Sequence, residues 1–225
     1  MRSEGPLLRV YRTLLNRFGH RGWWPGETRF EVMVGAILTQ NTNWKNVEKA
    51  IAGLKQKGLL TPESLASADL RTIESAIRSS GYYRQKAKRL KLFAKWLVEK
   101  YDGRLDLLFA APLSELRQEL LSLNGIGPET ADSILLYAGD KPVFVIDAYT
   151  RRVFGRMGFI SENASYCELQ RFFESSLPSD VELFKDFHAQ IVELGKTYCK
   201  KKPLCADCPL RRGCKSGGAL PKSDS

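Results

Sequence analysis

Residues 120–152 read LLSLNGIGPETADSILLYAGDKPVFVIDAYTRR, and this stretch decides the fold. Its leucines are predicted to end one helix. Gly125 and Gly127 follow, and such glycines let the backbone turn sharply and let another molecule approach without meeting a Cβ atom. Residues 130–138 then show the apolar spacing of a second helix. Asp147 lies just beyond the end of that helix.

The start of this second predicted helix is a candidate phosphate-binding site. Unpaired backbone N–H groups and the helix dipole together attract an anion at such a position. A helix, a glycine hairpin and a second helix can therefore hold a nucleic-acid backbone without reading its bases. Taken alone, the glycine pair favours an ordinary corner between two helices, and the rest of the chain reverses that preference.

The composition indicates a basic globular protein. Of its 225 residues, 35 are Lys or Arg and 25 are Asp or Glu, which gives a formal net charge of +10. This length can bury a substantial core in one domain or in two small ones. No apolar run reaches membrane-spanning length, and the N-terminus lacks the hydrophobic block of a signal peptide, so we expect a cytoplasmic, nucleoid-associated protein.

The positive charge is concentrated in two segments, which suits a polyanionic partner. A solvated helix face is the alternative explanation of the first segment. The two clusters are Arg84, Lys86, Lys88, Arg89 and Lys91, and Lys196, Lys200, Lys201, Lys202, Arg211, Arg212 and Lys215.

Helical periodicity dominates the rest of the chain, and no convincing alternating strand is found, so the predicted fold class is all-α. Thr61-Pro62 has the cap and first-position residues of a helix start. Besides the helix that begins there, the pattern predicts helices over 7–18, 30–38, 44–54, 70–79, 84–100, 113–123, 148–157, 166–176 and 181–197.

Four of the five cysteines form a compact pattern near the C-terminus, C-x5-C-x2-C-x5-C, made by Cys199, Cys205, Cys208 and Cys214. A disulfide framework does not suit a cytoplasmic protein. Structural zinc normally uses two close pairs, whereas only the central pair here is two residues apart. A [4Fe–4S] cluster needs four converging thiolates, and we favour it with zinc as the alternative. Such a loop would display Lys200, Lys201 and Lys202 towards phosphate.

In combination, these features resemble the endonuclease III family of DNA glycosylases. In this helix-hairpin-helix group, the hairpin precedes a Gly/Pro-rich loop and an aspartate. The resemblance extends over nearly the whole chain. It rests on FEVMVGAILTQNT at 30–42, GYYRQKAKRL at 81–90, LNGIGPETAD at 123–132, VIDAYTRR at 145–152 and the four cysteines.

The resemblance implies two helical lobes with a cleft between them. Bent DNA would cross the mouth of the cleft, and the damaged nucleotide would be flipped into it, because the glycosidic bond cannot be reached inside a duplex. The implied divisions are a helical bundle with the helix-hairpin-helix over 29–137, a second lobe from 1–28 plus 138–198, a cluster loop over 199–214 and a tail over 215–225.

The chain departs from the family pattern at two points. Bifunctional members have a lysine two residues after the second hairpin glycine, and it attacks the sugar to form a Schiff base. Glu129 occupies that position here and cannot form the imine, so we expect lyase activity to be absent or weak. The first interval between the cysteines is also one residue shorter than usual.

By the same resemblance, Asp147 is the candidate catalytic residue. A carboxylate is sufficient for a monofunctional glycosylase, because it can stabilise the oxocarbenium-like sugar and orient or deprotonate the attacking water. The alternative is that Asp147 only caps the helix that begins at Ala148, a contribution of about 1 kcal/mol.

The sequences WWPGETRFE and LTQNTNW resemble the 3-methyladenine branch of the family more than its pyrimidine-oxidation branch. This resemblance implies a base pocket walled by Trp24, Pro25 and Trp44, with Trp23 alongside. An alkylated purine is positively charged, and indole faces attract such a base by stacking and cation–π contact, about 0.5–2 kcal/mol for each ring. Core packing is the alternative role of these tryptophans.

Gln40 and Tyr82 lie at breaks between predicted helices, where the family inserts a side chain into the space left by the flipped nucleotide. Gln40 would hydrogen-bond the orphaned base, and Tyr82 would stack into the duplex. The predicted DNA contacts also include Gly125, Gly127, Thr130 and the three lysines of the cysteine loop.

The sequence therefore predicts a monofunctional DNA glycosylase of base excision repair, acting as a monomer on duplex DNA that contains alkylated bases. The enzymatic alternative is a mismatch glycosylase that removes thymine or uracil. From another class, a non-catalytic DNA-binding module or a zinc-stapled adaptor would carry the same motifs.

Overall fold

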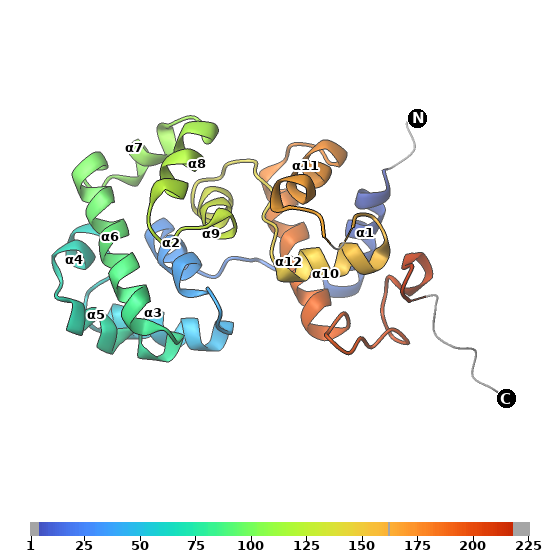
Figure 1. Ribbon diagram of the computed structural model, residues 1–225, viewed down its shortest axis with the longest axis horizontal. Coiled ribbons are helices and arrows are strands. Elements are labelled where there is room, and N and C mark those ends of the chain that lie inside the picture. The colour runs from blue at the N-terminus through green and yellow to red at the C-terminus, as the bar shows by residue number, and fades with distance from the viewer. Residues whose placement is uncertain (1–4, 162, 218–225) are drawn as a thin grey trace. The chain divides into compact units, whose positions relative to one another are not determined.

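The structure is a computed structural model that describes residues 5–161 and 163–217, and all regular elements in these ranges are helical, which confirms the predicted all-α fold (Figure 1). No helix among these residues is long and apolar enough to cross a membrane. The α-helices are α1 Pro6–Phe18, α2 Arg29–Leu38, α3 Trp44–Gln56, α4 Pro62–Ser67, α5 Leu70–Ala76, α6 Tyr83–Tyr101, α7 Leu105–Ala110, α8 Leu113–Ser122, α9 Pro128–Ser133, α10 Ala148–Met157, α11 Tyr166–Ser176 and α12 Val181–Thr197.

Local capping residues explain where several of these helices begin. Thr61 forms a reciprocal capping box with Ser64 ahead of α4, and Ser165 forms one with Glu168 ahead of α11. Each pair satisfies backbone N–H groups that the first turn of a helix leaves unpaired. The predicted bounds of α10, α11 and α12 are confirmed.

Two features of the helix pattern were not predicted. The short helix α7 has the sequence LDLLFA and lies in a stretch too brief to show a period. The helix after the hairpin changes from α-helical winding in α9 to a π-helical turn over Ile134–Ala138, in which every residue is buried. Such π turns occur frequently near functional sites.

The chain divides into two compact units, of which one is Trp24–Lys141. Its centre is α2, where all residues after Arg29 are buried, and the long helix α6 packs against α4 and α5 (Figure 1). We expected this bundle over 29–137. The compact unit also includes Trp24, whose ring packs on Tyr137, and Asp140, which forms an ion pair with Arg29.

The other unit combines Met1–Trp23 with Pro142–Ser225. Helix α12 packs against α1 and α10, and a cluster of phenylalanine rings fills the core between α10, α11 and α12. Phe144 and Phe173 stack with ring centroids 4.2 Å apart. Of the predicted tail over 215–225, residues 218–225 lie outside the described residues.

Candidate functional site

The two hairpin glycines have different structural roles. Gly125 has φ +85°, and a Cβ atom there would collide with the side chain of Arg89, so both its backbone angle and its neighbour require glycine. Gly127 has φ −92°, and no atom lies within 4 Å of the place where its Cβ would stand. The open face that we predicted for approach of another molecule is therefore found at Gly127.

A buried ion pair holds the two hairpin helices together. Arg117 on α8 donates from Nε to Asp132 Oδ1 at 2.7 Å and from Nη2 to Asp132 Oδ2 at 3.0 Å. Asp132 on α9 is fully buried. Two parallel bonds of this kind fix direction as well as distance, so they set the position of α8 relative to α9.

Gln40 is held by contacts inside the protein. Its Nε2 donates to Gly125 O and to Thr130 Oγ1, both at 3.0 Å, and its Oε1 accepts from Arg89 Nη1 at 2.5 Å. We expected the Gln40 amide to reach an orphaned base, but these three bonds occupy it. The Thr130 side chain, predicted to contact DNA, is buried against Gln40.

Asn41 of this loop, which the sequence did not single out, is exposed. It adopts a left-handed backbone conformation with φ +54°. Tyr82 has the same property at the start of α6, with φ +47° and 68% of its surface exposed. Left-handed backbone at non-glycine residues is costly and is typical of functional segments.

The first basic cluster is largely used inside the protein. Lys86 is buried, Arg89 binds Gln40, and Lys91 Nζ donates to Ala68 O. Only Arg84 and Lys88 of this cluster are exposed. The predicted polyanion-binding segment is therefore smaller than its sequence indicates.

Trp24 and Trp44 are brought together, as a base pocket requires. Their ring centroids lie 5.4 Å apart in an edge-on arrangement, and Tyr137 lies 5.3 Å from Trp24. Trp24 lies directly over Gly35, where a Cβ would stand 3.0 Å from its Nε1 atom. Trp44 Nε1 donates to Glu48 Oε1. Both tryptophans are half-buried, whereas Pro25, next to Trp24 in the chain, is exposed.

Trp23 belongs to the other compact unit. The Lys196 ammonium lies 5.2 Å from the centre of its ring. The Trp23 ring therefore contacts a lysine, whereas the Trp24 and Trp44 rings contact each other.

Asp147 is the N-cap of α10 and is held by three contacts. Its Oδ1 accepts from Thr150 N at 2.7 Å and from Thr150 Oγ1 at 2.8 Å. Its Oδ2 lies 3.6 Å from Nε2 of His188 on α12. The side chain remains 11% exposed, so one edge of the carboxylate is accessible.

The surroundings favour the ionised form of Asp147. Burial alone would raise the pKa of its carboxyl, but the facing His188 and the two donors of Thr150 outweigh burial and hold the pKa below its ordinary value. The capping role is therefore real, and the same contacts keep a nearly buried negative charge in place.

His188 is the residue of this site that the sequence did not reveal. Its side chain is 6% exposed, and it reaches Asp147 from a helix distant in the sequence. No spacing rule connects the two residues, because only the packing of α10 against α12 brings them together.

The four cysteines lie in a loop of tight turns after α12, and all are partly buried. Arg156 of α10 secures this loop, since its Nη1 lies 3.5 Å from Cys199 Sγ and donates to Lys200 O at 2.5 Å. Burial raises the pKa of the Cys208 thiol, and the other three cysteines add to this effect.

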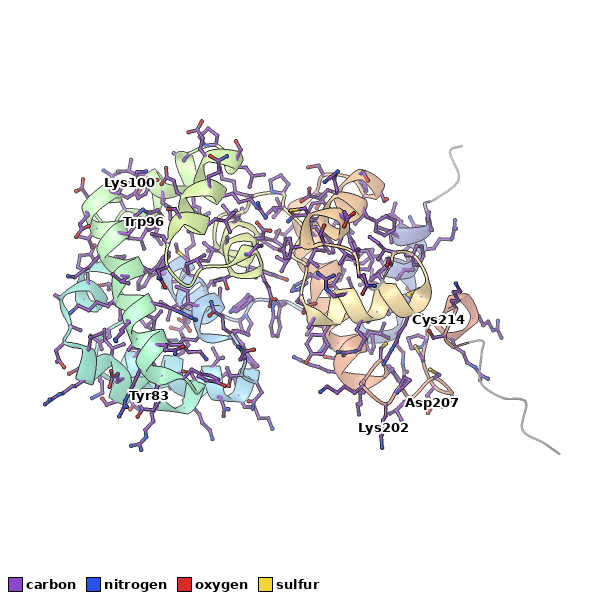
Figure 2. The ribbon with its side chains drawn as sticks, viewed as in Figure 1. Tyr83, Trp96, Lys100, Lys202, Asp207 and Cys214 are labelled. Carbon is purple, nitrogen blue, oxygen red and sulfur yellow. The ribbon has the colours of Figure 1, made fainter. Side chains whose placement is uncertain are left out.

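No three His, Cys, Asp or Glu side chains in the described part of the chain converge as around a metal ion. Four thiols are nevertheless the kind of donor set that an iron–sulfur cluster takes. The predicted phosphate-facing lysines Lys200, Lys201 and Lys202 are exposed, and Figure 2 shows Lys202 in the same loop as Asp207 and Cys214.

A cavity of about 350 Å³ lies between the second half of α6 and the hairpin. Its walls include Phe93 and Trp96 on α6 and Leu123 and Ile126 on the hairpin; Trp96 is labelled in Figure 2. None of the predicted base-pocket residues lines it.

The chain is similar to known DNA repair proteins over most of its length. The profile of the family described as "HhH-GPD superfamily base excision DNA repair protein" matches residues 34–179. A Methanocaldococcus jannaschii protein with the provisional name DNA repair glycosylase MJ1434 is 50% identical over 211 residues, which are 93% of this chain and 96% of that protein.

Two solved structures are similar over most of the chain. A trapped endonuclease III–DNA covalent intermediate has a TM-score of 0.81 and 27% identity, covering 94% of this chain and 95% of the other. The H. pylori 3-methyladenine DNA glycosylase MagIII bound to 1,N6-ethenoadenine has a TM-score of 0.74 and 30% identity, covering 84% of this chain and 95% of the other.

Proposed function

Because the chain belongs to the HhH-GPD superfamily of base excision DNA repair proteins, we propose that it is a monofunctional DNA glycosylase. Its substrate is duplex DNA with an alkylated base, and its reaction is hydrolysis of the N-glycosidic bond. The observation on which this proposal depends most is Asp147, a nearly buried carboxylate held in its ionised form.

DNA binding is assigned to the hairpin and to exposed basic residues. Gly127 leaves open space at the start of α9, and the N-terminal end of a helix attracts a phosphate. Lys200, Lys201 and Lys202 add positive charge that attracts the phosphate backbone of the DNA. Asn41 takes the place that we first gave to Gln40, and with Tyr82 it enters the space left by the flipped nucleotide.

The role of Asp147 follows from its low pKa. A carboxylate that binds protons weakly is a poor general base near neutral pH but a stable negative charge. Its main contribution is therefore electrostatic stabilisation of the oxocarbenium-like sugar, together with orientation of the attacking water. The bond from the sugar C1′ carbon to the base breaks, and a cationic alkylpurine departs as a neutral base with both bonding electrons. Water then bonds to C1′ and releases a proton to solvent.

The absence of a lyase step follows from Glu129. A Schiff base requires an amine at the position two residues after the second hairpin glycine, and the glutamate has none. The product is then an intact strand with an abasic site. In this respect the chain differs from the endonuclease III of the trapped covalent intermediate.

The proposed base pocket is built from Trp24, Pro25 and Trp44. The two rings are half-buried, so each keeps exposed surface on which a flipped base can stack. A positively charged alkylpurine gains cation–π attraction there and also leaves easily, so little acid catalysis is needed. Similarity to the H. pylori 3-methyladenine DNA glycosylase supports this specificity.

Cys199, Cys205, Cys208 and Cys214 would hold a [4Fe–4S] cluster. When bound, the cluster would cross-link the four thiolates and so fix the loop that displays the lysines. Arg156 of α10 also holds this loop in position, because it donates hydrogen bonds to two carbonyl groups of the loop backbone.

The decisive experiment is mass-spectrometric identification of the bases released from alkylated and from deaminated duplex DNA. Release of 3-methyladenine supports the proposal. Release of uracil or thymine alone would replace it with mismatch repair, and release of no base from any substrate would leave a DNA-binding module. A matched Asp147→Asn protein controls for contaminating glycosylases.

A further inference from the structure

Helix α6 carries two cations, Lys86 and Arg89, whose side chains point into the protein. Lys86 is 1% exposed, and its Nζ donates to Leu38 O at 2.9 Å and to Ser80 O at 2.6 Å. Arg89, one turn later, donates to Gln40 Oε1 at 2.5 Å. The proposed function uses neither side chain.

The acceptors of these bonds lie beside Asn41 and Tyr82, two of the four non-glycine residues of this unit that have left-handed backbone. Leu38 is three residues before Asn41, and Ser80 is two residues before Tyr82. A single ammonium group therefore connects the two loops on which the strained, exposed residues stand.

The Gln40 side chain extends this connection to the hairpin. It receives the Arg89 bond and donates to Gly125 O and Thr130 Oγ1. Arg89 also lies over Gly125, where a Cβ would collide with it. The loop of Asn41 is thus tied to α6 and to both ends of the hairpin.

Stability alone gives no reason for a lysine at this position. Burying an ammonium group is costly, and an apolar side chain of similar length would fill the same space. Burial, followed by the nearby Arg89 charge, lowers the pKa of Lys86 to about 8. The charged hydrogen bonds offset this cost and fix the directions of two carbonyl groups, one of them at the C-terminus of α2.

We propose that Lys86 and Arg89 are positioning residues that hold Asn41, Tyr82 and the hairpin in one fixed arrangement before DNA binds. Both side chains then enter the duplex together when the hairpin takes its phosphates. This inference rests on the proposed function and deepens it. Preorganisation of this kind removes the ordering step that a flexible loop would otherwise need before it inserts into the duplex.

The test measures insertion into DNA separately from binding. The probe is a duplex with 2-aminopurine opposite a tetrahydrofuran abasic analogue, whose fluorescence rises when the 2-aminopurine is unstacked. Stopped-flow fluorescence gives the unstacking rate, and anisotropy of the same duplex gives Kd. The variants are Lys86→Met and Arg89→Met, and Lys95→Met is the matched control because Lys95 is an exposed lysine further along α6.

We expect Lys86→Met to slow unstacking about tenfold, because two carbonyls lose a charged donor. Its Kd should change less than about threefold, as for Lys95→Met, since a buried lysine makes no phosphate contact. Lys86→Gln, which keeps an amide donor, should recover part of the rate. Unstacking at the wild-type rate in folded Lys86→Met, or equal loss of rate and affinity, would overturn the proposal.

A second set of variants keeps the proposal testable if Lys86→Met does not fold. Arg89→Met and Gln40→Leu break the same bond from opposite ends, so each should slow unstacking and the double variant should be no slower than the slower single one. Additive effects would contradict the assignment. If the wild type neither unstacks the probe nor releases a base, the proposed function itself fails, which is a different result.

Discussion

The two compact units place their proposed functional groups in opposite ways. In the unit of Pro142–Ser225 with the N-terminal segment, Asp147 is nearly buried, and its oxygens face Thr150 and His188. In the unit Trp24–Lys141, Asn41 and Tyr82 are exposed on strained loops. A reacting charge needs a fixed, water-poor surrounding, whereas groups that enter a duplex must stand clear of the protein.

This comparison predicts that Asp147→Asn has the largest effect of any single change. The amide keeps the shape of the carboxylate but removes its charge, so base release should fall about 10²–10³-fold or more. DNA affinity should be unchanged, because binding belongs to other residues. Single-turnover base release and anisotropy on the same alkylated duplex measure the two quantities. Parallel loss of both would contradict the assignment of base release to Asp147 and of DNA binding to other residues.

Trp44→Ala tests the proposed base pocket of the unit Trp24–Lys141. Losing one indole face should weaken excision of a charged alkylbase about tenfold, with Trp44→Phe falling in between. Binding of undamaged duplex should stay the same. If melting temperature and undamaged-DNA binding fall together, Trp44 is a packing residue and the pocket assignment fails.

His188→Leu tests whether His188 lowers the pKa of Asp147, through the pH dependence of base release. Without the facing imidazole, burial raises the pKa of Asp147, so the acid limb of the pH–rate profile should move up by about one pH unit or more. His188→Gln keeps a donor and should move it less. Coincident profiles for wild type and His188→Leu would show that His188 only fills space.

The hairpin glycines should separate stability from binding. Gly125→Ala forces a side chain into left-handed backbone and against Arg89, so it should destabilise the protein by about 1–3 kcal/mol. Gly127→Ala meets open space and should keep the melting temperature while weakening DNA binding a few-fold. The reverse pattern would mean that the two roles are exchanged.

The smallest effect concerns acid stability. Because the folded pKa of Asp147 is lowered, its carboxylate stabilises the fold above its unfolded pKa, and this contribution is lost as pH falls through the folded pKa. The difference in unfolding free energy between wild type and His188→Leu should therefore be largest near neutral pH and shrink below about pH 4. Denaturant unfolding at several pH values measures it, and a constant difference would exclude a role of ionisation.

Local sequence signals were sufficient for most of the fold. Apolar spacing gave the bounds of α10, α11 and α12, because this signal acts within a few turns of a helix. The short helix α7 was not predicted, because its six residues contain too few turns to show a helical period. The π turn over Ile134–Ala138 also escaped, because its apolar residues suit either winding.

Single residues of the proposed site could be named from the sequence, whereas their distant partners in the structure could not. Asp147 and the hairpin glycines could be named from their local pattern. The contacts of Gln40 with Arg89 and of Asp147 with His188 join residues 49 and 41 positions apart, so no local rule reveals them. For the same reason, Lys86 was placed in a surface cluster although its side chain is buried.

The central claim is hydrolysis by a carboxylate without an amine adduct, and borohydride trapping tests it most directly. The protein is incubated with alkylated duplex DNA and sodium borohydride, and free base, strand nicks and covalent protein–DNA species are measured together. We predict stoichiometric base release, an intact strand with an abasic site and no covalent species. A trapped adduct that forms in step with base release would contradict the account.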